Sequence, residues 1–86
     1  MTPNTNAGEL TLNGRIYPNP NTGMFKIEMN IKDNYIVEVM DVRGAIISKI
    51  TVEGTTIPVE INASSGMYLV RVSSAEGTVT QRVQVL

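Results

Sequence analysis

Apolar and polar residues alternate with a period of two along most of this chain, and no stretch repeats every 3.6 residues as an amphipathic helix would. The alternation is clearest in Met24–Asn30, Met67–Ser73 and Thr78–Leu86, where one face of each stretch is mainly apolar. Each of these stretches predicts a half-buried β-strand, and the chain therefore predicts an all-β domain.

Turn-forming residues divide the alternating pattern into about seven strands. The expected strands are Arg15–Tyr17, Met24–Asn30, Tyr35–Val42, Ala45–Glu53, Thr55–Ile61, Met67–Ser73 and Thr78–Leu86. The expected turns include Lys32–Asn34, Asp41–Gly44 and Glu53–Gly54. Short strands at regular spacing predict an immunoglobulin-like antiparallel sandwich of Greek-key type. Pro58 lacks a backbone donor, which places its strand at a sheet edge.

A proline-rich corner, Tyr17-Pro18-Asn19-Pro20, precedes the best-patterned part of the chain. Each proline fixes its own φ and pushes the residue before it toward extended geometry. Gly23, just beyond, is free to take a positive φ in the turn that follows. The corner predicts a break between residues 1–14, which are either a linker or a segment of artificial origin, and one folded domain over residues 15–86.

Composition removes several classes of chemistry. The chain has neither cysteine nor histidine, so it has no disulfide, no thiolate zinc site and no histidine base. A net charge of −1 argues against nucleic-acid binding, which needs a basic surface. We expect no enzyme activity, no cofactor and no metal.

Two groups of residues could carry function but have a simpler structural explanation. Asp41 could act as an acid, yet Asp41 and Gly44 stand where a type I turn favours these residue types. Tyr17, Tyr35 and Tyr68 could form a carbohydrate-stacking platform. Period-two spacing already places Tyr35 and Tyr68 in or beside the core, and we favour that interpretation.

The landmarks taken together resemble a known family. They are Tyr17–Pro20 with Gly23 and Phe25, Val37–Gly44, Ile57–Ile61, Gly66–Val72, and Gly77 with Arg82 and Val83. This order is similar to the C-terminal sorting domain of type A cargo of the type IX (Por) secretion system of Bacteroidetes. The resemblance covers Arg15–Leu86.

The resemblance implies a seven-stranded immunoglobulin-like domain that follows a cargo domain and directs it through the outer-membrane translocon. Shuttle and sortase proteins would then recognise the domain and usually cleave it upstream of the corner. The protein would be exported, passing through the periplasm to the outer-membrane surface or the exterior. We expect recognition at the last strand, which offers an accessible edge or end, with Arg82, Val83, Val85 and Leu86 as the main signal. Gly66 and Tyr68 belong to the strand Gly66–Val72, which would be the scaffold of that signal. Deleting Gln84–Leu86 should leave the domain largely folded.

Two other functions stay open at the level of sequence: a non-catalytic carbohydrate-binding or adhesion module, and a structural spacer. Weak homodimerisation also stays open, either through Thr78–Leu86 or through the edge strand that contains Pro58.

Overall fold

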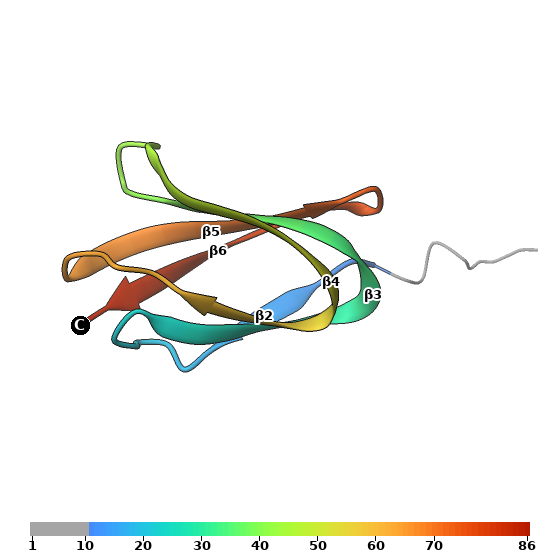
Figure 1. Ribbon diagram of the computed structural model, residues 1–86, viewed down its shortest axis with the longest axis horizontal. Helices are drawn as coiled ribbons and strands as arrows, with labels where there is room; N and C mark the ends of the chain where they lie inside the picture. The colour runs from blue at the N-terminus through green and yellow to red at the C-terminus, as the bar shows by residue number, and fades with distance from the viewer. Residues whose placement is uncertain (1–10) are drawn as a thin grey trace, which may run out of the picture.

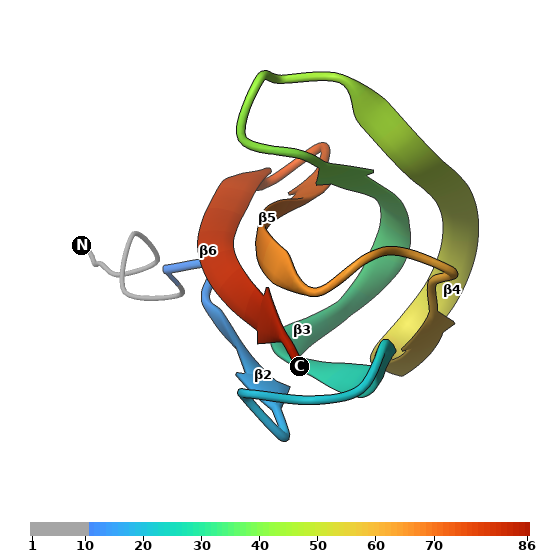
Figure 2. The same ribbon diagram turned by 90° about the vertical axis from the view of Figure 1, so that its left-hand side faces the viewer.

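The computed structural model describes residues 11–86, and all regular structure within them is β-strand. Its five strands are β2 (Gly14–Tyr17), β3 (Met24–Met40), β4 (Ile46–Glu60), β5 (Gly66–Ser74) and β6 (Gly77–Val85). They form one antiparallel sheet in the order β2-β3-β5-β6, with β4 pairing to β3 as well. Seen along its length, the sheet curls around a central core (Figures 1 and 2). No helix in residues 11–86 is long and apolar enough to cross a membrane.

Two of the expected turns are bends inside long strands, which is why the structure has five strands in this region and not about seven. Lys32–Asn34 lies within β3, and Glu53–Gly54 lies within β4. Pairing between the two strands moves from Glu28 opposite Thr56 to Asp33 opposite Gly54, so β3 bulges there. Gly54 has φ +137°, a conformation that glycine adopts readily and that lets β4 bend alongside.

The bend gives β3 two sets of neighbours. The first half of β3 pairs with β2 and with the end of β4. Its second half pairs with β5 and with the start of β4. The apolar faces of these two regions meet in one core, so the predicted direction of the alternating side chains is confirmed. The largest fully buried side chains are those of Tyr35, Ile27, Ile57, Val37, Val39, Val70 and Val83.

The fold begins before Arg15, where the predicted linker was expected to end. Gly14 is the first residue of β2, and Asn13 pairs with Asn30 through Asn13 N–H to Asn30 Oδ1 (2.8 Å) and Asn30 N–H to the Asn13 carbonyl (3.1 Å). Leu12 packs against the core. The rest of the predicted linker, residues 1–10, lies outside the described residues.

The β6 side and the β4 side of the curled sheet differ in their contacts. On one side, the Gln81 side chain of β6 reaches β2 and donates to the Gly14 carbonyl at 2.6 Å. On the other side, β3 is the only strand in residues 11–86 that pairs with β4. The prediction that Pro58 lies in an edge strand is therefore confirmed within this range.

Candidate functional site

The segment that follows β2, Pro18–Asn21, lies along the end of β6, and we call it the clip. The peptide bonds Tyr17–Pro18 and Asn19–Pro20 are both cis. The Asn19 side chain donates from Nδ2 to the Arg82 carbonyl (3.0 Å) and accepts from the Gln84 N–H (3.0 Å). A carboxamide offers one donor and one acceptor side by side, so Asn19 pairs with β6 much as the backbone of another strand would.

Asn21 continues this pairing with its own backbone. Its N–H donates to the Gln84 carbonyl (2.9 Å), and its carbonyl accepts from the Leu86 N–H (2.8 Å). These bonds form a short parallel bridge between Asn21 and Val85. The clip therefore covers the backbone edge from Arg82 to Leu86, so the last strand is accessible at its end, where Leu86 is exposed, and not along this edge.

The Asn21 side chain holds the clip itself in shape. It is buried, donates to the Pro18 carbonyl (3.0 Å) and accepts from the Gly23 N–H (2.8 Å). Gly23 then accepts from the Ile61 N–H at 2.8 Å. A Cβ on Gly23 would lie 2.7 Å from the Ile61 carbonyl oxygen, and φ there is +108°, so only glycine fits without strain. The clip thus fastens the end of β6 and the end of β4 to one corner.

The predicted recognition residues gather at this end of the molecule, but they divide into two kinds. Arg82 and Leu86 are exposed, and Leu86 retains 65% of its accessible surface. Val83 and Val85 are buried and belong to the core. They can therefore support a recognition surface but cannot form it.

The neighbouring strand supplies the other two predicted positions. Gly66 lies opposite Val85, and Tyr68 lies opposite Val83 in the β5–β6 register. Tyr68 is buried, and its hydroxyl donates to the Ser64 carbonyl at 2.6 Å. Tyr68 therefore belongs to the core together with its partner Val83, and its hydroxyl fixes the loop before β5.

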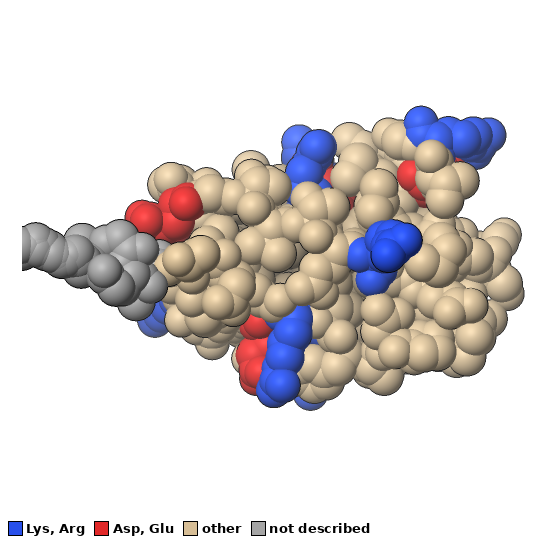
Figure 3. Space-filling model, turned by 180° about the vertical axis from the view of Figure 1, so that it is seen from behind, with Lys and Arg blue, Asp and Glu red and all other residues tan. Residues whose placement is uncertain are grey.

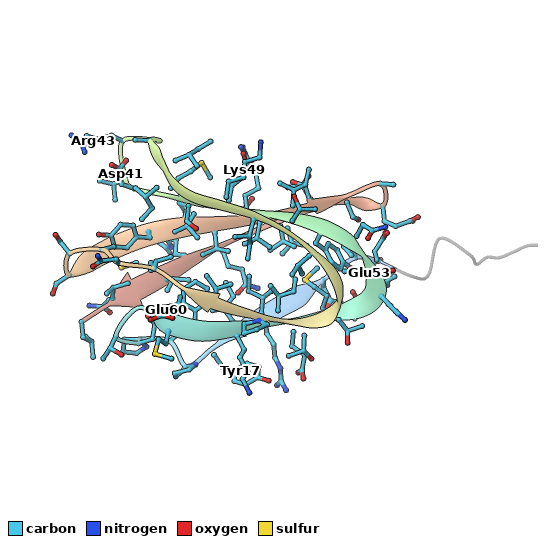
Figure 4. The ribbon with its side chains drawn as sticks, in the orientation of Figure 1. Tyr17, Asp41, Arg43, Lys49, Glu53 and Glu60 are labelled. Carbon is cyan, nitrogen blue, oxygen red and sulfur yellow. The ribbon has the colours of Figure 1, made fainter. Side chains whose placement is uncertain are left out.

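Asp41 acts as the turn residue that its sequence context predicts. Its Oδ1 accepts from the Arg43 N–H (2.9 Å) and the Ala45 N–H (3.0 Å), and the Gly44 N–H donates to its carbonyl (2.9 Å). Its Oδ2 pairs with the Arg43 guanidinium at 3.0 Å, with both side chains near the surface (Figure 4). The bond from Arg43, together with the Ala45 N–H, holds the pKa of the Asp41 carboxyl below its usual range. These contacts keep the carboxylate charged and occupied in the turn.

Charged side chains do not gather on the face of residues 11–86 that Figure 3 shows. Lys, Arg, Asp and Glu are spread over the face seen in Figure 3, with wide uncharged areas between them. Within residues 11–86, no three His, Cys, Asp or Glu side chains come together as metal ligands could. Tyr35 and Tyr68 are buried, which leaves Tyr17 as the exposed tyrosine of the three and removes the stacking platform.

A groove of about 540 Å³ lies beside the start of the clip and was not predicted from the sequence. Tyr17, Pro18, Met24 and Pro58 are among its apolar lining residues, and Lys26 and Glu60 also line it. Its walls come from β2, β3 and β4, so only the pairing of distant segments brings them together. The clip was also missed, although the Asn21-Thr22-Gly23 turn that shapes it has a recognisable Asx-turn signal.

Comparison with known proteins agrees with this geometry. No curated protein matches the chain. The family model described as "Secretion system C-terminal sorting domain" matches residues 15–86, which include the clip, the Asp41 turn and β6. The chain therefore belongs to the family of C-terminal sorting domains of the type IX secretion system.

Proposed function

We propose that this chain is a non-catalytic sorting signal that is read at the end of β6. Membership in the family implies a preceding cargo protein, the type IX machinery and export across the outer membrane. The finer steps are part of the proposal: passage through the periplasm, recognition by shuttle and sortase proteins, cleavage upstream of the corner, and attachment or release at the cell surface. The seven-segment, immunoglobulin-like description of the fold belongs to it too, supported by the two sets of neighbours that the bend gives β3.

One observation supports the β6 end as the surface that is read. Arg82 and Leu86 are exposed on a strand end whose backbone is hydrogen-bonded to Asn19 and Asn21 on one side and paired with β5 on the other. A rigid strand loses little conformational entropy when a partner binds it. The guanidinium of Arg82 and the apolar side chain of Leu86 then offer one charged and one apolar contact.

This surface has the character of a protein-recognition site. Arg82 lies directly opposite the partly buried Leu69 of β5 in the sheet register, so the two side chains share one face of the sheet. Arginine is enriched at protein interfaces because it combines planar donors with an apolar stem. Among the described residues, Tyr35 and Tyr68 are buried, so the three tyrosines form no aromatic platform on which a glycan could stack. The carbohydrate-binding alternative is therefore not favoured.

The proposal is tested by fusing a reporter to the N-terminal side of the full chain and measuring its secretion. We expect the reporter in the culture medium or on the cell surface of a type IX-competent host, and in the periplasm of the same host without its translocon. Equal secretion by both strains would contradict a type IX signal.

The role of the strand end is tested with two matched variants of exposed residues on β6. Arg82→Ala should lower the secreted fraction at least several-fold, whereas Thr80→Ala, on the same outward face, should leave it unchanged. Thermal unfolding of both variants shows whether folding is preserved. If a folded Arg82→Ala protein is secreted as well as Thr80→Ala, β6 is not read through Arg82.

A further inference from the structure

The outer edge of the first half of β4 is an unpaired strand edge. Within residues 11–86, Ile46–Gly54 pairs with β3 on one side, and no backbone hydrogen bond outside the strand ladders involves it. Such an edge presents a row of N–H and C=O groups that another strand can pair with. In Figure 1 this stretch starts at the upper left and descends to the bend on the right, whereas the end of β6 lies at the lower left beside the C-terminus.

The side chains along this edge are complementary to those of a second copy of the same stretch that runs in the opposite direction. The stretch reads Lys49-Ile50-Thr51-Val52-Glu53, with an apolar residue on each side of Thr51 and opposite charges beyond them. When two copies run antiparallel about a two-fold axis at Thr51, Lys49 lies opposite Glu53 of the other copy, and this happens twice. A two-fold interface requires such self-complementarity.

The same register matches the two faces of the sheet. Ile50 and Val52 are partly buried and pack against the core, so they point inward, whereas Lys49, Thr51 and Glu53 are exposed. Antiparallel pairing about Thr51 sets Ile50 opposite the second copy's Val52 and keeps apolar residues on the inner face. A register displaced by one residue would place inward residues opposite outward ones.

Both charged residues are available for this contact. Lys49 and Glu53 form no ion pair with any residue in the described range, and both are exposed. Lys49 projects outward from the ribbon in Figure 4. Glu38 lies opposite Lys49 on β3, but its carboxylate is bound by Arg71 at 2.8 Å. Asn34, which faces Glu53 from β3, is neutral.

We propose that a second copy of this chain pairs with the β4 edge, antiparallel and centred on Thr51, to form a weak homodimer. The inference does not rest on the sorting function, because it uses only the β4 edge. It selects this half of β4 over both the Pro58 half and the end of β6, which the clip covers. Pairing ends near Gly54, where β4 bends.

A single cysteine at the axis gives a direct test. Opposed residues in an antiparallel pair have Cα atoms about 4.5–5.5 Å apart, which lies within the range that a disulfide spans. The chain has no cysteine of its own. Under mild oxidation the full chain carrying Thr51→Cys should form a disulfide-linked dimer at least roughly ten-fold faster than the chain carrying Thr80→Cys, an exposed position on β6. Equal rates would overturn the proposal.

Charge reversal tests the register. Glu53→Lys sets Lys49 opposite a lysine twice and should raise the dimer Kd roughly ten-fold in sedimentation equilibrium. Lys49→Glu combined with Glu53→Lys restores opposite charges and should return the Kd to within about two-fold of wild type. A chain that stays monomeric at millimolar concentration, or a dimer whose Kd ignores Glu53→Lys, would overturn the proposal.

Discussion

The outer edges of β6 and β4 both have backbone N–H and C=O groups that no neighbouring strand binds. The two edges differ in what covers these groups. The end of β6 is covered by the clip, which hydrogen-bonds through the Asn19 side chain and the Asn21 backbone. The first half of β4 has no such cover within the described residues. The covered edge coincides with the expected signal, and the uncovered edge carries the self-complementary sequence around Thr51.

The difference shows that covering an edge takes specific contacts and does not follow from the strand pattern alone. Both strands alternate apolar and polar residues, yet only β6 has a neighbour that imitates a strand. On β4 the protection is weaker and comes from Pro58 and from the bend at Gly54, both of which limit how far another strand can pair. We therefore expect mutations to have large effects around the clip and small ones along the β4 edge.

The largest effect is expected from deleting Gln84–Leu86. The deletion removes Val85, which is 2% exposed, together with the hydrogen bonds that join Asn21 to Gln84 and Leu86. Losing a core side chain and these bonds should cost about 3–5 kcal/mol of unfolding free energy, which is a large part of the stability of a small domain. We therefore expect this deletion to destabilise the fold strongly, in contrast to the expectation from the sequence alone.

Circular dichroism and urea unfolding measure this loss. Leu86→Ala, which removes an exposed side chain and keeps its backbone N–H, serves as the control and should change stability by less than about 0.5 kcal/mol. A truncated chain with the urea midpoint of wild type would show that the clip does not hold β6.

The next largest effect is expected from Asn21→Ala. The substitution leaves the Pro18 carbonyl and the Gly23 N–H without their side-chain partner in a buried corner. We expect a loss of about 2–3 kcal/mol in unfolding free energy. Asn62→Ala, at an exposed loop position, is the matched control. The corner is less important than we infer if the two variants unfold at the same urea concentration.

A smaller loss, about 1 kcal/mol, is expected from Asn19→Ala, because water can replace the exposed side chain at the Arg82 carbonyl and the Gln84 N–H. Asn19→Asp keeps the acceptor for the Gln84 N–H and loses the donor, so it should fall between Asn19→Ala and wild type. Urea unfolding ranks the three proteins. If both variants are as stable as wild type, the hydrogen bonds of the Asn19 side chain do not stabilise the end of β6.

The smallest effect is expected from Glu53→Lys in the isolated monomer. Glu53 is exposed and has no ion-pair partner among the described residues, so unfolding free energy should change by less than about 0.5 kcal/mol. The measurement is made by dilute-solution urea unfolding, below the concentration at which dimers form. A loss as large as that of Asn21→Ala would remove the contrast between the two edges.

Local patterning predicted the strands and their buried faces, because period-two alternation reports directly which side chains face the core. The same patterning predicted turns at Lys32–Asn34 and Glu53–Gly54, which are bends inside strands. Polar residues and glycine occur both in turns and in such bends, so the sequence does not distinguish the two. It also predicted the Asp41 turn, whose contacts lie within four residues.

The clip could not be predicted in the same way. The contacts of Asn19 join residues 63 and 65 positions apart, and no local pattern encodes such a pairing. The predicted recognition residues were brought together, but only the side chains of Arg82 and Leu86 among the β6 candidates face outward. Burial of Val83 and Val85 follows from the same alternation that predicted the strand.

Hydrogen exchange of individual backbone amides, followed by NMR in dilute solution, tests the contrast between the two edges most directly. We expect slow exchange at Asn21, Gln84 and Leu86, because their N–H groups join the clip to β6. We expect rapid exchange at every second amide of Ile46–Gly54, because those N–H groups point away from β3. Exchange at Gln84 and Leu86 as fast as along the β4 edge would contradict this contrast.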